Sequence, residues 1–291
     1  MNWQSWLIGI FRSMGYGTPL LIATSGEIYS ERSGVLNLGV EGVIAFGAFV
    51  GFAITFQTSN PWLGLMSAGL AGGLISLIHA FLSITLRANQ VISGLALTMI
   101  GTGLAGLFGR GWEGTPLPFL ARRILLTQNN FIFFTLILAL LLWFFLFKTR
   151  VGISIRATGE NPAAADASGI NVWRIRYWCV FVGGVLAGIA GGYVSIIYRP
   201  AWTEGTTGGM GWLVIALTIF SFWNPIWAIL GAYFFSAIFH LSFRLQAWIA
   251  PELLKSSPYI LTIITLFFIG IVKLKIKKAP AALTQPYERG E

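Results

Sequence analysis

The sequence has few charged side chains, since Asp, Glu, Lys and Arg together make up only 10% of its 291 residues. An ordinary soluble domain carries roughly 25%. Hydrophobic residues make up 56%, and the mean hydropathy is +0.76. Four uncharged apolar runs each reach the ~20 residues that one helix needs to cross a bilayer: 42–86, 124–147, 178–198 and 205–239. This composition excludes a soluble domain and predicts an all-α, polytopic membrane helix bundle.

Cysteine and the common catalytic motifs are also scarce. The single cysteine, Cys179, excludes a disulfide framework and a cysteine metal site, and we expect it to be buried and inert. The sequence contains no G-x-x-x-x-G-K-[ST], H-E-x-x-H or G-x-S-x-G. The string GTGLAG at 101–106 fits a dinucleotide fingerprint only formally, because it lies within an apolar run with no strand before it. We therefore expect no catalysis, no metal and no cofactor on this chain, so that any ATP is bound by a partner subunit only.

The apolar runs and the turn residues between them predict nine spans, give or take one. These lie near 7–26, 38–56, 62–86, 91–108, 129–147, 177–198, 210–223, 225–243 and 257–273. We treat 1–291 as a single transmembrane domain with a polar central loop at 148–176 and a polar tail at 274–291.

Basic residues predict the orientation of the chain. The net charge of +9 comes from Lys and Arg that gather at span ends, and we infer no nucleic-acid partner from it. Loop 148–176 and the lysines after residue 272 are basic, so both are expected to be cytoplasmic. Counting spans backwards puts 27–37 and 87–90 on the same side and the N-terminus outside. Arg110, Arg122 and Arg123 then lie outside, against the rule.

The central loop carries the signals of a short helix. Asn161 is a good N-cap, Pro162 suits the first helical position, and Gly169 suits the left-handed residue after the last turn. The segment PAAADAS is slim enough to sit in a groove of a partner protein. An ordinary solvated loop is the alternative.

Two polar segments interrupt the apolar regions. Asn37 and Glu41 lie at the start of the second span, where an ionisable group is costly unless it faces protein or water. Glu41 is therefore either a pathway residue or a structural partner of Arg32 or another basic group. Segment 198–212 resembles it on the opposite side of the membrane, which hints at an inverted repeat. The histidines, His79 and His240, are expected to be packing residues.

Three segments carry a family resemblance: GVLNLGVEG (34–42), ATGENPAAADASGI (157–170) and FWNPIWAILGAYFFSAIF (222–239). They resemble permease subunits of bacterial ABC importers in the branched-chain amino acid, ribose and nucleoside group, most of all its nucleoside or simple-sugar branch. The resemblance implies a multi-pass subunit of the bacterial cytoplasmic (inner) membrane. It implies as partners two cytoplasmic ABC ATPase subunits, a second permease subunit, identical or paralogous, and an extracytoplasmic binding lipoprotein.

The resemblance also implies roles for individual residues. A coupling helix seated in the ATPase would be formed by Gly159, Glu160, Asn161, Pro162, Ala163, Ala164, Asp166 and Gly169. The translocation pathway would pass Asn37, Glu41, Thr206 and Met210. The chain departs from the family pattern at Ser221 and Phe222, where a small or glycine-containing pair is usual, and at Met210, where a basic residue is frequent. We expect these departures to bear on the substrate.

Two other classes of protein are weighed against the importer. A proton- or ion-coupled secondary transporter of a small neutral solute would use Glu41 and His79 as carriers and would need no ATPase. A membrane-embedded enzyme would need carboxylates, histidines or a nucleophile clustered within the spans, and the sequence shows no such cluster. With ten acidic residues in all, a neutral solute is favoured over a charged one.

Overall fold

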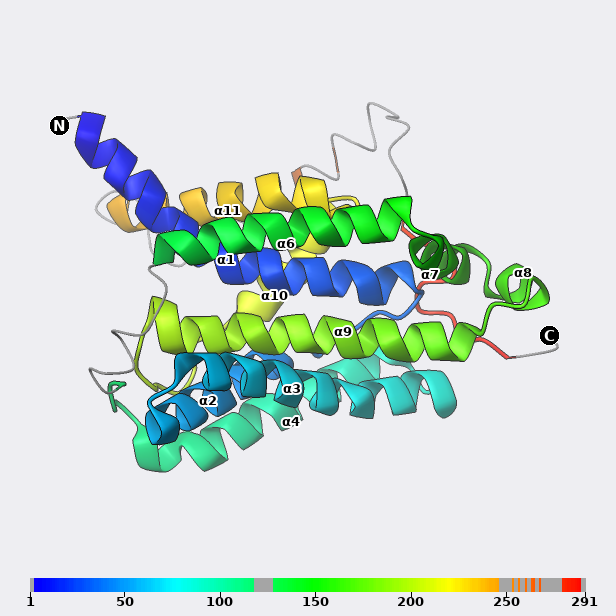
Figure 1. The fold of residues 1–291 in the computed structure, drawn as a ribbon, viewed down its shortest axis with the longest axis horizontal. Coiled ribbons are helices and arrows are strands. Elements are labelled where there is room, and N and C mark those ends of the chain that lie inside the picture. The colour runs from blue at the N-terminus through cyan, green and yellow to red at the C-terminus, as the bar shows by residue number, and fades with distance from the viewer. Residues whose placement is uncertain are drawn as a thin grey trace.

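The computed structural model describes residues 3–117, 128–245 and 279–288, together with single residues at 253, 256, 260, 263, 264 and 267. The helices are α1 (Trp3–Arg32), α2 (Val40–Thr58), α3 (Pro61–Ala80), α4 (Gln90–Gly109), α6 (Gln128–Lys148), α7 (Arg150–Glu160), α8 (Pro162–Ala167), α9 (Val172–Tyr193), α10 (Met210–Phe220) and α11 (Pro225–Leu245). Short π-helical turns, Phe81–Thr85 and Val194–Tyr198, extend α3 and α9. The described part of the chain is a bundle of long helices lying side by side (Figure 1).

Most of the predicted spans that the structure describes correspond to long helices. Five helical stretches are long and apolar enough to cross a membrane: Val40–Thr58, Pro61–Thr85, Gln90–Trp112, Asn130–Lys148 and Val172–Tyr198. α1 and α11 lie beside them in the bundle (Figure 1). The ninth predicted span, 257–273, lies almost entirely outside the described residues.

Two predictions about helices need correction. The span expected at 210–223 is a helix of only 11 residues, α10, which is too short to cross the bilayer alone. The central loop holds two helices instead of one, because α7 precedes α8 and runs crosswise to the long helices (Figure 1). Thr149 begins α7 by accepting a hydrogen bond from the Gly152 amide at 3.1 Å.

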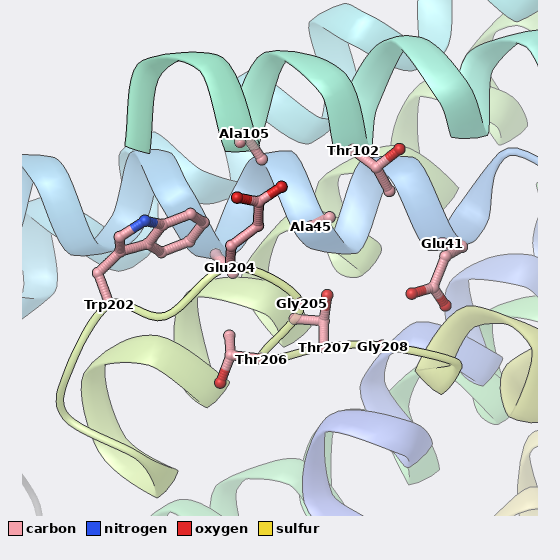
Figure 2. Close-up of a pocket in the computed structure, with 12 residues that line it drawn as sticks. Glu41, Ala45, Thr102, Ala105, Trp202, Glu204, Gly205, Thr206, Thr207 and Gly208 are labelled. Carbon is pink, nitrogen blue, oxygen red and sulfur yellow. The ribbon is translucent and has the colours of Figure 1, made fainter. Parts of the chain in front are cut away.

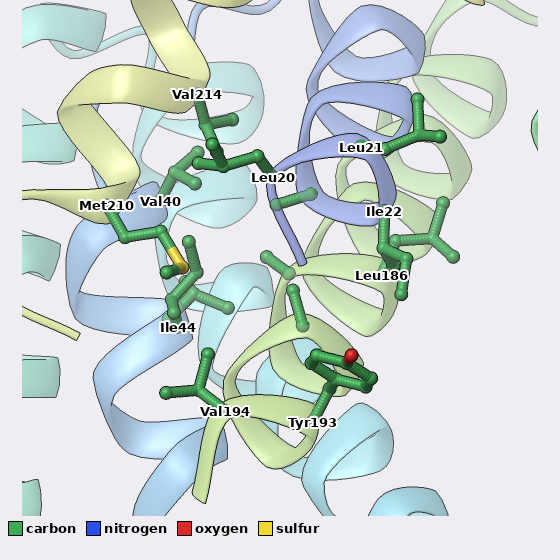
Figure 3. Close-up of a cluster of buried hydrophobic side chains, with 14 of the residues drawn as sticks. Leu20, Leu21, Ile22, Val40, Ile44, Leu186, Tyr193, Val194, Met210 and Val214 are labelled. Atoms are coloured by element: carbon green, nitrogen blue, oxygen red, sulfur yellow. The ribbon is translucent and has the colours of Figure 1, made fainter. Parts of the chain in front are cut away.

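Glycines let α9 approach its neighbours closely at the centre of the bundle. A Cβ added to Gly47 of α2 would lie 2.6 Å from the Cα of Gly188 in α9, and one added to Gly72 of α3 would lie 2.7 Å from the same atom. Small faces of this kind are how helices pack in lipid, where the hydrophobic effect does not drive them together. Around this contact, α1, α2, α9 and α10 contribute the main buried cluster, which includes Leu20, Ile44, Tyr193 and Val214 (Figure 3).

The segments expected on the cytoplasmic side meet at one end of the bundle. Arg176 in α9 donates to the Gln285 carbonyl of the tail at 3.3 Å, and Arg87 forms an ion pair with Glu288. α7, α8 and the described tail all lie at this end, and α1 begins at the other (Figure 1). The grouping agrees with the prediction that these segments lie on one side of the membrane, and we name this end the cytoplasmic end after that prediction.

Candidate functional site

Two interrupted helices meet inside the bundle. α1 is followed by the irregular segment 33–39 before α2 begins at Val40, and the turn after α9 is followed by segment 199–209 before α10 begins at Met210. A Cβ added to Gly211 would collide with the backbone of Glu41, so the N-termini of α2 and α10 lie against each other. α2 is long enough to cross a membrane and α10 is not, so a complete span and a short helix meet here at their N-termini.

Glu41 joins the N-termini of α2 and α10. Its carboxylate oxygens accept hydrogen bonds from the Gly209 amide at 3.0 Å and the Gly211 amide at 2.6 Å. The first amides of a helix have no partner within the helix and carry partial positive charge, so a carboxylate satisfies both needs of α10 at once. The alternative in which Glu41 pairs with Arg32 is wrong, because Arg32 bonds instead to the carbonyls of Phe222 and Trp223.

Segment 33–39 is irregular and mostly buried, yet its backbone polar groups have hydrogen-bond partners, as buried non-helical backbone requires. Asn37 is 2% exposed, and its side chain accepts from the Gly39 amide at 2.9 Å. His79 bonds to Ser93 and to the Leu36 carbonyl, at 2.6 and 3.0 Å, which gives it the packing role that its sequence position suggested. The Asn37 amide also donates to Glu27, the Leu36 amide donates to Gln90, and the Thr98 hydroxyl donates to the Leu38 carbonyl.

A cavity of about 170 Å³ lies beside Glu41, between α2, α4 and the segment 202–208. Figure 2 shows Glu41 and Glu204 on its wall, with Thr102 of α4 nearby. No Lys or Arg is among the residues that line it. Carboxylates only accept hydrogen bonds when ionised, so this wall suits a solute that offers hydroxyl or amide donors and disfavours an anion.

A second cavity, of about 360 Å³, lies on the other side of the same segment. Met210, Arg199 and the stacked pair Tyr16 and Phe239, whose ring centroids are 4.2 Å apart, contribute to its lining. Thr206 lines both cavities, and its buried hydroxyl has no hydrogen-bond partner among the described residues. Of the four residues expected on a pathway, Glu41, Thr206 and Met210 thus line cavities, whereas Asn37 lines neither.

The predicted loop helix forms as its end signals indicated. Asn161 caps α8 by accepting from the Ala164 amide at 2.9 Å, and Pro162 occupies the first turn. Gly169 has φ +82°, and the amides of Gly169 and Ile170 donate to the carbonyls of Asp166 and Ala165 at 2.9 and 3.0 Å. Those two bonds are the Schellman pattern that ends a helix.

The residues expected to contact the ATPase differ in how exposed they are. Asn161, Ala163, Ala164 and Gly169 are exposed, and Pro162 and Asp166 are half-buried. Gly159 and Glu160 belong to α7, so the single helix expected over Gly159–Gly169 is wrong at its start. Gly159 is buried, and a Cβ there would collide with the Arg32 carbonyl. Figure 1 shows α8 projecting beyond the ends of the long helices.

No pattern in the sequence predicted the contacts that this end makes with the tail. The Ala282 amide donates to the Gly159 carbonyl at 2.9 Å, and Ala282 is 3% exposed. Cys179 is buried, as expected. Within 3–117, 128–245 and 279–288, no group of three His, Cys, Asp or Glu side chains is placed to hold a metal ion.

Comparison with known proteins gives a consistent answer. The family model described as branched-chain amino acid transport system / permease component matches residues 9–274. The guanosine ABC transporter permease protein NupQ of Bacillus subtilis is 36% identical, with 95% of each chain covered. TsgC13 of Haloferax volcanii, provisionally named a glucose ABC transporter permease, is 37% identical over 94% of each chain. The nucleoside ABC transporter permease protein NupC of Lactococcus lactis is 34% identical, over 88% of this chain and 90% of NupC.

A solved structure shares the fold. It is an ABC transporter in an inward-facing conformation, provisionally assigned to the metal-chelate type. The TM-score is 0.52 at 18% identity, with 93% of this chain and 87% of that chain covered.

Proposed function

Because this chain belongs to the permease family of branched-chain amino acid transport systems, we propose that it is a membrane subunit of an ABC importer for a nucleoside or a simple sugar. The relatives named for guanosine, nucleosides and glucose support this substrate class, since each aligns with most of the chain. A second permease subunit completes the pathway. The ATPase subunits bind and hydrolyse ATP, and a binding protein delivers the solute on the opposite side of the bacterial cytoplasmic membrane.

The observation that carries the proposal is α8. It is capped at both ends and projects from the cytoplasmic end, and its exposed side chains are small. A six-residue helix is too short to be stable by itself, so its caps must stabilise the helical conformation before the ATPase binds. The exposed face at Ala163 and Ala164 suits a close fit in a groove of the ATPase.

The site inside the bundle supports the transport half of the proposal. The N-termini of α2 and α10 meet at Glu41, and the segment that precedes α10 separates two cavities. Movement of that segment would exchange the access of a solute between them. The acidic, cation-free wall of the smaller cavity fits a neutral solute with hydroxyl groups, such as a sugar or a ribose moiety.

A secondary transporter has weaker support. Its two candidate carriers are occupied: Glu41 holds the amides of Gly209 and Gly211, and His79 bonds to Ser93 and the Leu36 carbonyl. Protonating either group to carry an ion would disturb the contacts that hold the interrupted helices.

Co-purification of the chain with its ATPase tests the proposal. Ala163→Glu and Ala164→Glu place charge on the exposed face of α8, and Gln57→Glu places the same charge on an exposed residue in the last turn of α2. We expect the ATPase to co-purify with wild type and Gln57→Glu and to be lost with both α8 variants. Absence of any ATPase, together with uptake that a protonophore abolishes, would establish the secondary transporter instead.

A further inference from the structure

The turn between α10 and α11 is strained. Phe222 and Trp223 both have φ +54°, in the left-handed region that residues other than glycine rarely occupy. Two such residues in succession persist only where surrounding contacts hold them. Trp223 is 8% exposed and the preceding Ser221 is fully buried, so the turn is fixed from inside the protein.

The last turn of α1 supplies the contacts that hold this turn. Arg32 donates from Nε to the Trp223 carbonyl at 3.1 Å and from Nη2 to the Phe222 carbonyl at 3.2 Å. The neighbouring Glu31 accepts a hydrogen bond from the Trp223 indole. Arg32 is 3% exposed, so these bonds are shielded from water.

The same arginine also contacts the element that precedes α8. Its third nitrogen, Nη1, lies 3.9 Å from a carboxylate oxygen of Glu160, and Gly159 packs directly on its carbonyl oxygen. Asn161, the next residue along, is the N-cap of α8. Arg32 thus lies between the residues that precede α8 and the strained turn, because it forms an ion pair with Glu160 and hydrogen bonds to the turn.

The strained turn leads to the candidate pathway. From it, α10 runs only 11 residues back to the Gly209 and Gly211 amides that Glu41 holds. Because a helix that short moves as one body, a change at Phe222 and Trp223 would displace the segment between the two cavities.

We propose that Arg32 is a positioning residue through which displacement of α7 and α8 reaches the α10–α11 turn, and from there the segment between the cavities. This inference rests on the proposed function, because it takes α8 as the seat of the ATPase. It adds the route from that seat to the pathway, and it identifies the left-handed turn as the element that changes.

A glycine substitution separates this role from simple stabilisation of the turn. Glycine adopts left-handed backbone without penalty, so Phe222→Gly relieves the strain at one of the two left-handed residues. In the reconstituted complex with the ATPase, Arg32→Gln should lower the amount of solute transported per ATP hydrolysed by about tenfold. This factor lies within the range typical of coupling between sites. The variant Phe222→Gly keeps Arg32 and should transport more solute per ATP hydrolysed than Arg32→Gln. The double variant should regain part of the thermal stability lost in Arg32→Gln and remain poorly coupled.

A second measurement needs no knowledge of the solute. Spin labels on Ile153→Cys, at an exposed position of α7, and on Gly208→Cys report the distance between α7 and the segment between the two cavities, and the only native cysteine is buried. In complex with the ATPase, ATP should change this distance in wild type and Phe222→Gly but not in Arg32→Gln.

Either of two results would overturn the inference. One is recovery of transport in the double variant, which would make Arg32 a stabiliser only. The other is an ATP-driven distance change that persists in Arg32→Gln. Failure of wild type to bind an ATPase at all is a different result, because it rejects the proposed function and this inference with it.

Discussion

Replacing Glu41 with glutamine tests the central contact between the N-termini of α2 and α10. The side chain keeps its length, but one of its two acceptor oxygens becomes an NH₂ group. That group would face either the Gly209 or the Gly211 amide, both of which are donors, so one hydrogen bond is replaced by a donor facing a donor. The remaining hydrogen bond is made to a neutral amide oxygen instead of a charged carboxylate.

The expected cost is large for an isosteric change. Hydrogen bonds to a charged group contribute about 1.5–3 kcal/mol each, and a buried donor left without a partner costs about 1–3 kcal/mol. A carboxylate at a helix N-terminus contributes up to ~2 kcal/mol more in partly buried sites. These contributions overlap, so we expect Glu41→Gln to lower the free energy of unfolding by about 3–5 kcal/mol.

The assay is unfolding of the purified protein in mixed micelles by titration with a denaturing detergent, followed by circular dichroism. Glu204→Gln is the matched control, because it makes the same chemical change at an exposed residue of the same cavity and should cost no more than about 0.5 kcal/mol. A loss below about 1 kcal/mol for Glu41→Gln, or equal losses for the two variants, would refute the reasoning.

Three further changes have expected outcomes. Gly47→Ala should cost about 1–3 kcal/mol in the same titration because its Cβ meets the α9 backbone, while Gly103→Ala, with nothing within 4 Å, should be neutral or slightly stabilising; equal effects would contradict the packing argument. Asn161→Ala removes the N-cap of α8, which is worth about 1 kcal/mol, and should weaken ATPase binding about fivefold in a titration of the purified subunits. Unchanged affinity would mean that the cap does not hold α8 in the conformation that binds the ATPase. Deleting 279–291 takes the Gln285 carbonyl from the buried Arg176 and should cost about 1–3 kcal/mol of unfolding free energy; full stability would show that the tail is not part of the packed structure.

Local signals in the sequence were sufficient wherever the structure depends on neighbouring residues. Uncharged runs predicted the long helices because hydrocarbon excludes charge regardless of topology. The ends of α8 were predictable because Asn161, Pro162 and Gly169 act on backbone groups within four residues of themselves. α7 was missed because its alternation of apolar and charged residues, RVGISIRATGE, looks like a polar loop when read only for spans.

Contacts between distant segments could not be predicted in this way. Glu41 and Gly211 are 170 positions apart, and nothing in the composition of either segment specifies the other as its partner. The docking of the tail on Gly159 is hidden for the same reason. Sequence reasoning did single out Ser221 and Phe222 as unusual, but it assigned them to the substrate. The structure instead places Phe222 in the turn held by Arg32, and it lines neither cavity.

The meeting of two helix N-termini at one carboxylate has an electrical consequence. Each N-terminus carries the equivalent of roughly half a positive charge, and Glu41 lies in the first turn of α2 while it caps α10. One ionised carboxylate therefore balances both ends. A membrane potential does work of about 2.3 kcal/mol per elementary charge per 100 mV, but only on net charge. If the proposed transport moves this junction, that movement would accordingly be nearly electroneutral, and the cell's voltage would neither drive it nor hold it back.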